Sequence, residues 1–426
     1  MQRRWMSAVA ATAVVPFCAM ATNGLNLIGF GTESVAMAGA DTAVARDTSA
    51  LNTNPAGLAQ LARPAFDGYL AAAFSLDVGH SDSLGNNRQV DNHVIPLGGF
   101  GISSPWAGGQ GVVGLGFFAQ GGAGAVYKSL RTPFGTDDEL SGLIGIVRVT
   151  PGLAWRLSDE LTLGAAAPLN VIVVKQRVFP GTSALNTNNP AQSFFGLKLD
   201  GVQGAHLGLR LGAMWKPDAA WTFGASYSPK TKLDAKRGDA EVNFSAIGLG
   251  VVPYGNARIE GFALAREIAL GAAWQASART LVSLKLAHLD WSNAIRNVTV
   301  TLSEPGNAAA PAQISQTARV DWRDQTVTAI GVAQALSDKL TAYAGFNHAR
   351  NPAPSETLTP LLAAIRTRHA TSGFTYRVDD GWLASGAIEY QFRNRVVYNN
   401  PNIPLGAPAE ERSRYVALNC MLSRRW

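Results

Sequence analysis

The sequence has few charged residues and almost no cysteine. Charged residues make up 15% of the 426 residues, against about 25% in ordinary soluble domains. Of the two cysteines, Cys18 lies in an expected leader and Cys420 remains alone, so no intrachain disulfide and no cysteine-based metal site can form. No block of like charges indicates a nucleic-acid surface. These absences exclude a disulfide-stabilised scaffold and argue against a nucleic-acid partner.

Long apolar runs and catalytic motifs are also missing. After residue 21, no uninterrupted apolar run approaches the roughly 18 residues that a membrane helix needs. The six histidines are scattered without a pair at ligand spacing, so we expect no metal site. Gly114-Leu115-Gly116 is not followed by the helix and acidic residue of a dinucleotide site, and no GxSxG motif is present. We therefore expect neither a cofactor nor an enzymatic activity.

Residues 1–21 have the three parts of a secretory signal peptide. Arg3 and Arg4 form the basic start, residues 7–20 are apolar, and Ala19-Met20-Ala21 provides a cleavage site. The mature chain is expected to begin at Thr22, with a net charge of +4 after the two arginines are subtracted from +6. Apolar residues remain at 47%, and glycine is abundant at 44 residues. An exported, charge-poor, glycine-rich chain without a membrane helix favours a β-protein of the outer membrane.

Alternation of side chains supports this interpretation. Residues 221–228 place Trp, Phe, Ala and Tyr on one face and Thr, Gly, Ser and Ser on the other. Residues 382–393 alternate in the same way. Barrel strands alternate a lipid face with a water face over about ten residues. Strands of a soluble sandwich alternate too, but they are usually about five or six residues long.

Connections of two kinds follow each other strictly. Six short turns and seven longer polar segments predict a 14-stranded antiparallel outer-membrane β-barrel over residues 63–426. The final strand ends in Trp426, and a terminal aromatic residue resembles the signal that the barrel assembly machinery recognises. The expected turns are 104–111, 158–160, 216–220, 275–279, 337–339 and 379–381, and the expected loops are 79–92, 124–142, 178–199, 236–263, 300–321, 350–366 and 399–411.

Residues 22–62 precede the barrel and lack sustained strand alternation. A barrel of this width has an interior larger than its own side chains fill. The apolar content of the segment disfavours a disordered periplasmic tail, so we expect a plug in the lumen. Within it, Asn54 is suited to cap a short helix that begins at Pro55. The similar stretch 184–191 falls in an expected outside loop and is interpreted as a coincidental turn.

Short motifs in a fixed order resemble the FadL/TodX family of outer membrane transport proteins. They run from NGLN, GFG, MAGA and NPA at residues 23–26, 29–31, 37–40 and 54–56 to LDWS, WRD and NPAP at 289–292, 322–324 and 351–354. The resemblance implies a 14-stranded barrel closed by an N-terminal hatch at residues 22–62, with Asn54, Pro55 and Ala56 as a hatch motif. Family members carry long-chain fatty acids or aromatic hydrocarbons. The resemblance further implies capture by outer loops, hatch movement and sideways release at a kink in the third strand.

Glycines mark the expected kink. Gly121, Gly122 and Gly124 cluster in residues 111–127, which form the third strand by turn counting. Glycine within a strand often marks a bulge or bend. With the resemblance, this cluster is the candidate lateral gate. The alternative is a bend that makes room for the hatch or for a neighbouring strand.

Candidate ligand contacts are aromatic and basic. Phe179, Phe194 and Phe195 lie in the expected loop 178–199 and could form an exposed capture groove or only a small loop core. Arg210 and Lys285 fall on the polar phase of their strands and could bind a carboxylate in the lumen. Alternatively, they pair with lumen acids such as Glu267 or Glu389.

The resulting hypothesis is passive uptake of hydrophobic compounds, with long-chain fatty acids favoured as the ligand. Uptake of aromatic hydrocarbons is the first alternative. A polar-solute porin and a structural or adhesive barrel remain open as further alternatives. We expect a monomer surrounded by outer membrane lipids, with a small hydrophobic molecule as its ligand.

Overall fold

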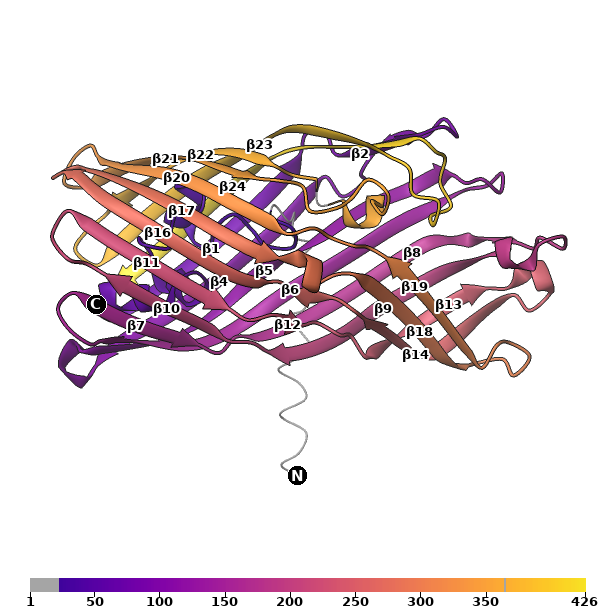
Figure 1. Ribbon diagram of the computed structural model, residues 1–426, viewed down its shortest axis with the longest axis horizontal. Helices are drawn as coiled ribbons and strands as arrows, with labels where there is room; N and C mark the ends of the chain where they lie inside the picture. Colours follow the sequence, from indigo (N-terminus) through magenta and orange to yellow (C-terminus); the bar gives the residue numbers. More distant parts are fainter. Residues whose placement is uncertain (1–22, 364) are drawn as a thin grey trace, which may run out of the picture.

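The computed structural model describes residues 23–363 and 365–426, and it is a closed antiparallel barrel (Figure 1). The predicted signal peptide lies outside the described residues. The wall contains fourteen strands, several of which are interrupted and carry more than one label. Pairing of β1 with β24, from Ala65 opposite Arg425 to Ser75 opposite Tyr415, closes the barrel.

The elements have the following bounds. The first six wall strands are β1 (Ala65–Ser75), β4 (Val94–Trp106), β5 (Gly111–Arg131), β6 (Asp137–Arg156), β7 (Leu161–Ala166) with β8 (Leu169–Ala184), and β9 (Phe194–Leu207) with β10 (Arg210–Trp215). The next four are β11 (Trp221–Ser228) with β12 (Thr231–Lys232) and β13 (Arg237–Asn243), β14 (Val251–Glu260) with β15 (Ala263–Leu264) and β16 (Arg266–Ser277), β17 (Thr280–Asp290) with β18 (Asn297–Pro305), and β19 (Gln313–Arg319) with β20 (Gln325–Ala335). The last four are β21 (Leu340–Ala349), β22 (Arg368–Arg377), β23 (Trp382–Tyr398) and β24 (Ala409–Arg425). A small hairpin, β2 (Gly79–Asp82) and β3 (Asn87–Gln89), lies between β1 and β4.

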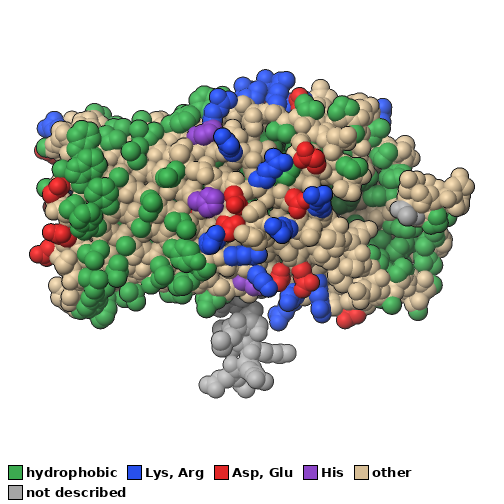
Figure 2. Space-filling model, viewed as in Figure 1, with side chains coloured by type: hydrophobic (Ala, Val, Ile, Leu, Met, Phe, Trp, Pro, Cys, Tyr) green, Lys and Arg blue, Asp and Glu red, His purple; other side chains and the backbone are tan. Residues whose placement is uncertain are grey.

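The outer surface is apolar over the half of the barrel that carries the short turns (Figure 2). Exposed apolar side chains there include Leu70, Leu284 and Leu422. Tryptophans cluster at the turn end, where the rings of Trp106 and Trp155 lie 5.1 Å apart. Aromatic residues favour the membrane–water interface, and an apolar surface of this extent requires lipid around it. We call this surface the lipid belt.

All six expected short turns are confirmed, and the expected loops 350–366 and 399–411 agree closely with the structure, but the expected loops 124–142, 178–199, 236–263 and 300–321 are too long. Strands β5 and β6 run on to Arg131 and from Asp137, and β8 and β9 run on to Ala184 and from Phe194. Beyond the lipid belt both faces of a strand meet water, so the alternation of apolar and polar residues fades. Backbone pairing continues there all the same, as between Leu140 and Val178.

The first described residues, 23–62, lie inside the barrel, and we call them the N-terminal segment (Figure 1). They contain α1 (Thr32–Ala36), η1 (Thr48–Asn52) and η2 (Pro55–Gln60). Wall glycines make room for them: a Cβ built on Gly164 would lie 2.2 Å from the backbone of Ala56, and one on Gly345 would lie 2.5 Å from that of Met37. Such close approach requires glycine on the wall.

The remaining short helices lie in connections. They are η3 (Ala107–Gly109), η4 (Pro190–Gln192), η5 (Ser245–Ile247), η6 (Trp291–Asn293) and η7 (Pro360–Leu362). No helix in the described part of the chain is long and apolar enough to cross a membrane.

Candidate functional site

Asn54 anchors the N-terminal segment to the wall. Its Oδ1 accepts a hydrogen bond from the N–H of Ala56 at 3.2 Å, which caps η2, and Pro55 occupies the first turn. Its Nδ2 donates to the carbonyl of Thr42 at 2.7 Å and to that of Ala213 on β10 at 3.0 Å. The predicted cap is therefore confirmed, although the helix is 3₁₀ rather than α. At the similar stretch, Asn189 precedes η4 but makes no side-chain cap.

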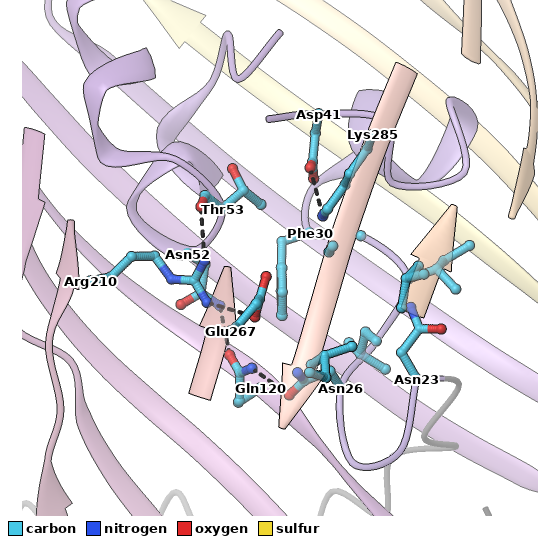
Figure 3. Close-up of a pocket in the computed structure, with 16 residues that line it drawn as sticks. Asn23, Asn26, Phe30, Asp41, Asn52, Thr53, Gln120, Arg210, Glu267 and Lys285 are labelled. Atoms are coloured by element: carbon cyan, nitrogen blue, oxygen red, sulfur yellow. Dashed lines mark hydrogen bonds and ion pairs between the residues drawn. The ribbon is translucent and has the colours of Figure 1, made fainter. Parts of the chain in front are cut away.

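Charged contacts add to this anchor (Figure 3). Arg210 on β10 donates to the carbonyl of Thr53 at 2.9 Å and lies 3.2 Å from Glu267 on β16. Lys285 on β17 lies 3.1 Å from the carboxylate of Asp41 in the segment. Both cations therefore have partners, as one of the sequence-based alternatives proposed. Glu267 was one of the two acids named as possible partners, whereas Asp41 was not named.

Arg210 and Lys285 line one cavity, whose empty space up to its opening is about 450 Å³. The cavity lies between the N-terminal segment and the wall, and Figure 3 shows Phe30 projecting into its centre. Phe30 is positioned by a hydrogen bond from its N–H to Ser34 Oγ at 3.1 Å. Ser34 Oγ in turn donates to Asp41 at 2.5 Å. The segment's ion pair and the cavity's aromatic side chain thus belong to one connected network.

Strand β5 is kinked at the predicted glycines. The pairing with β6 shifts by one residue between Ala119 and Gly121. Gly121 and Gly122 have φ of 154° and 148°, values that other residues rarely adopt. Gly124 lies in the same stretch, but its φ is not positive. The cluster therefore contains a bulge, and two of its three glycines carry the unusual backbone.

The kink separates β5 from β4. Their pairing runs from Gly111 opposite Trp106 to Phe118 opposite Gly99 and stops there, although β4 continues back to Val94. The two sides meet again where the N–H of Asp91 donates to the carbonyl of Val126 at 2.7 Å. Between these points the wall lacks β4–β5 ladder bonds, and we call this interval the wall gap.

Residues 23–27 of the N-terminal segment lie against the wall gap. The N–H of Gly122 donates to the carbonyl of Leu25 at 3.2 Å, and Gln120 Nε2 donates to Asn26 Oδ1 at 3.3 Å. Leu27 packs against Leu97 of β4 and Ala119 of β5. An apolar side chain of the segment therefore sits between the two strands whose pairing is lost.

A second cavity lies beside the kinked strand, with about 360 Å³ of empty space when the open space at its mouth is included. Its apolar lining includes Ala123 and Ile365, and its polar lining includes Tyr127, Glu411 and the buried Arg366. Sequence reasoning missed Arg366, because it lies in a segment expected to be an exposed loop. Periodicity carries no signal for a loop that folds back into a barrel.

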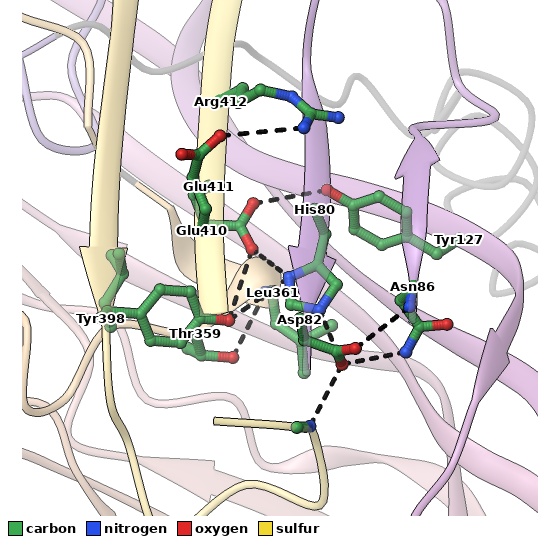
Figure 4. A network of polar contacts seen from close by, with 12 residues as sticks. His80, Asp82, Asn86, Tyr127, Thr359, Leu361, Tyr398, Glu410, Glu411 and Arg412 are labelled. Atoms are coloured by element: carbon green, nitrogen blue, oxygen red, sulfur yellow. Dashed lines mark hydrogen bonds and ion pairs between the residues drawn. The ribbon is translucent and has the colours of Figure 1, made fainter. Parts of the chain in front are cut away.

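A buried polar network continues from Glu411 (Figure 4). His80 Nδ1 lies 2.7 Å from Glu411, and its Nε2 lies 3.2 Å from Asp82. Burial alone would lower the pKa of His80, but hydrogen bonds and charge from Glu411 and then Asp82 raise it overall. Burial raises the pKa of Glu411, with opposing contributions from His80 and the hydroxyl of Tyr398. The network joins β2 to β24 outside the lipid belt.

The three phenylalanines proposed for ligand capture have mixed environments. The expectation of an exposed ring is wrong for Phe179, which is fully buried next to Tyr127 and Leu130. Phe194 and Phe195 are half-buried. Phe194 packs on Phe179 with ring centroids 6.2 Å apart. The contacts agree with the alternative of a loop core for Phe179, and the capture role stays a prediction.

Comparisons with known proteins agree with the fold and identify the family. The sequence profile of the outer membrane protein transport protein family (OMPP1/FadL/TodX) matches residues 8–419. The Ralstonia pickettii toluene transporter TbuX superposes with a TM-score of 0.75 at 21% identity, covering 94% of this chain and 99% of that chain. The P. putida toluene transporter TodX gives 0.77 at 20% identity, with coverage of 94% and 99%. A Pseudomonas aeruginosa FadL homologue gives 0.72 at 17% identity, with coverage of 95% and 99%.

Among curated protein sequences, none matches the chain significantly. The solved structures therefore establish the fold, while the profile match over nearly the whole length establishes the family. The chain is an outer-membrane β-barrel that belongs to the outer membrane protein transport protein family OMPP1/FadL/TodX.

Proposed function

We propose that this protein lets small hydrophobic molecules diffuse across the outer membrane and leave sideways into the bilayer through the wall gap. The observation that carries the proposal is the end of β4–β5 pairing at Phe118, with Leu27 packed between the two strands. A polar solute gains nothing from an exit that faces lipid, whereas an apolar one is transferred into a favourable medium. Family membership supports transport at this membrane.

The N-terminal segment acts as a hatch in this proposal. A ligand that reaches the cavity next to Phe30 competes with the contacts of residues 23–27, whose displacement opens the wall gap. The hatch remains attached to the wall through Asn54 and Asp41. Sideways release therefore needs only a local movement and no ejection of the whole segment.

Two classes of ligand fit, each for its own reason. Long-chain fatty acids are favoured by the mixed lining of the second cavity beside the kink, where Arg366, which also contacts the ring of Tyr415, adjoins apolar side chains. Aromatic hydrocarbons are favoured by the first cavity, where the cations Arg210 and Lys285 already have carboxylate partners. The toluene transporters TodX and TbuX share the fold and support this second class. A neutral Arg366→Met variant separates the classes, because only uptake of a carboxylate should suffer.

The test of the exit is deletion of Gln120. One residue is extra on β5 between Ala119 and Gly121, so its removal should straighten the strand and restore pairing with β4. We expect cells producing the variant to lose uptake of radiolabelled oleate and toluene. The matched control deletes Ala276, the extra residue of a bulge between Gln275 and Ser277 on β16, and should transport normally. Both variants are first checked for folding by heat-modifiable migration in gels.

Two results would contradict the proposal. Unchanged uptake by the folded Gln120 deletion would show that the wall gap is not the exit. A large steady ion conductance of the intact protein in planar bilayers would favour a polar-solute porin.

A further inference from the structure

The outer wall changes from apolar to basic within one step along neighbouring strands. Leu286, Ile330 and Phe346 point outward with 51%, 43% and 40% of their surface exposed, and they belong to the lipid belt. The next outward positions toward the long loops are His288, Thr328 and His348, all exposed. Two residues along a strand span about 7 Å. The edge of the lipid belt is therefore sharp on this side of the barrel.

Basic side chains occupy this edge on consecutive strands, and Figure 2 shows charged side chains gathered in a band beside the apolar half. His348 on β21 lies directly opposite Arg368 on β22 and opposite Thr328 on β20. Arg350 follows two residues after His348 and is also exposed. The guanidinium of Arg368 lies 5.9 Å from the ring centroid of Phe392, which holds it on the barrel surface. We call His348, Arg350 and Arg368 the basic collar.

The basic collar has no acidic partner within residues 23–363 and 365–426. Two other exposed arginines of the outer wall are paired: Arg266 lies 2.9 Å from Asp290, and Arg393 contacts Asp77. Arg350 and Arg368 are diagonal neighbours across the β21–β22 pair, and like charges on neighbouring strands repel each other when nothing neutralises them. An anion from outside the chain would remove this repulsion.

The position of the basic collar relative to the membrane indicates which anions can reach it. Long connections of an outer-membrane barrel face outward and short turns face the periplasm. The collar lies on the long-connection side of the lipid belt, which is the level of the outer-leaflet headgroups. Arginine forms bidentate hydrogen bonds to phosphate oxygens in a geometry that few other groups match. Clusters of basic residues at a membrane surface attract anionic headgroups.

We propose that the basic collar binds the phosphate groups of the phosphorylated glycolipid that forms the outer leaflet. The lipid's acyl chains lie along the apolar surface of Phe346 and Ile330, and its phosphates contact Arg368 and Arg350. This contact fixes the protein's height in the membrane. It does not depend on the transported ligand or on the wall gap.

The experiment measures binding of lipid A to the detergent-purified full chain by native mass spectrometry. The variant is Arg350→Gln with Arg368→Gln. The matched control is Arg377→Gln, which removes an exposed arginine at the turn end of the same strand β22. Two surface arginines at about 1 kcal/mol each correspond to roughly 30-fold weaker binding by the double variant, while the control stays within about 2-fold. Lipid A stripped of both phosphates should bind the unaltered protein as weakly as lipid A binds the double variant.

A second variant keeps the test informative if the double variant folds poorly. Arg368→Lys retains the charge but removes the planar fork, and we expect binding that is weakened by several-fold. Equal binding of intact and dephosphorylated lipid A would overturn the proposal. So would equal losses in the collar variant and the Arg377 control.

Discussion

The two ends of the N-terminal segment are attached to the barrel in different ways. Its later part is anchored by charged and multiple contacts: Asp41 to Lys285, Thr53 to Arg210, and Asn54 to Ala213. Its first part, residues 23–27, touches the kinked strand through neutral hydrogen bonds of 3.2 and 3.3 Å and through Leu27. The firmly held end faces β10 and β17, and the lightly held end faces the wall gap.

This difference predicts which end of the segment opens more easily. Hydrogen bonds to charged groups are about twice as strong as neutral ones. Breaking a buried ion pair at one partner costs about 3–5 kcal/mol, whereas losing a neutral hydrogen bond costs about 1 kcal/mol. We therefore expect residues 23–27 to open while residues 41–60 stay in place. Four predictions test this difference between the two ends.

The largest effect is expected for Asn54→Leu. The change leaves the carbonyls of Thr42 and Ala213 and the N–H of Ala56 without their partner in a buried site. Each unpaired buried group costs about 1–3 kcal/mol, so the attachment of residues 41–60 to the wall should be destabilised by about 3–5 kcal/mol. Hydrogen exchange of residues 41–60, measured by mass spectrometry, should accelerate strongly.

The control for this change is Asn189→Leu. Asn189 also precedes a proline at the start of a 3₁₀ helix, but it is exposed and makes no cap. We expect no change in the exchange of residues 41–60. Equal exchange in the two variants would show that Asn54 is not an anchor.

The next effect concerns the ion pair inside the barrel. Lys285→Met leaves the buried carboxylate of Asp41 without its cation and should cost about 3 kcal/mol. The addition of Asp41→Asn should restore part of this loss. Denaturant unfolding in detergent gives the four free energies of the double-mutant cycle.

A solvent-accessible pair on the same barrel provides the comparison. Lys198 and Glu241 lie 2.9 Å apart but are partly exposed, so Lys198→Met should cost about 0–1 kcal/mol. Equal losses in the free energy of unfolding for the two lysine variants would show that the buried ion pair does not hold residues 41–60 more firmly than residues 23–27.

A smaller and more local effect is expected for Gly121→Ala. The new Cβ would lie 2.0 Å from the carbonyl oxygen of Leu25, and the backbone has a φ of 154°. At a cost of about 2 kcal/mol, residues 23–27 should move away from the wall gap while β5 stays paired with β6. Hydrogen exchange of residues 23–30 should rise and that of 41–60 should not. Gly255→Ala is the control, because its nearest atom would be 3.6 Å away.

The smallest effect is expected from a change of pH, which acts on the polar network between β2 and β24. The folded-state pKa of His80 is raised, so its stabilisation is complete below the unfolded value of about 6.5 and is lost as pH rises through the folded value. The raised pKa of Glu411 acts in the same direction, with its contribution complete below about 4.5. The pKa of Asp82 is lowered despite its burial, because Asn86 and His80 bond its carboxylate, and its contribution is lost only as pH falls below about 4.

Raising the pH from about 6 to 9 should therefore loosen the β2–β24 contact. Hydrogen exchange of residues 76–92 measures this effect. The variant His80→Gln should show less pH dependence in this region. Equal pH dependence of residues 76–92 in His80→Gln and in the unaltered protein would contradict the role of His80.

Much of the wall could be predicted from the sequence. Lipid on one side and water on the other impose alternation within each membrane-spanning strand, and tight turns require residues such as those at 216–220. The glycine cluster of the third strand was predicted for the same local reason, since only glycine adopts the backbone of Gly121 and Gly122. The cap at Asn54 is also local, because it depends on residues 54–56 alone.

The extent of the outer strands and the partners of the lumen side chains could not be predicted. Residues such as 124–131 are polar enough to resemble a loop, yet they pair with β6 because a long strand shields backbone groups in water as well as in lipid. The burial of Phe179 and of Arg366 depends on chain segments that fold back into the barrel from far along the sequence.

By itself, the sequence determined the strand number, the place of the kink and the capped turn at Asn54, because each follows from contacts between near neighbours and from the solvent on either side. The pairing of Asp41 with Lys285 and the packing of Leu27 against β4 and β5 follow from the three-dimensional fold. These contacts join residues more than two hundred positions apart, or a segment to two strands at once. These residues come together only when the barrel closes around the N-terminal segment, so no pattern among neighbouring residues in the sequence predicts their contacts.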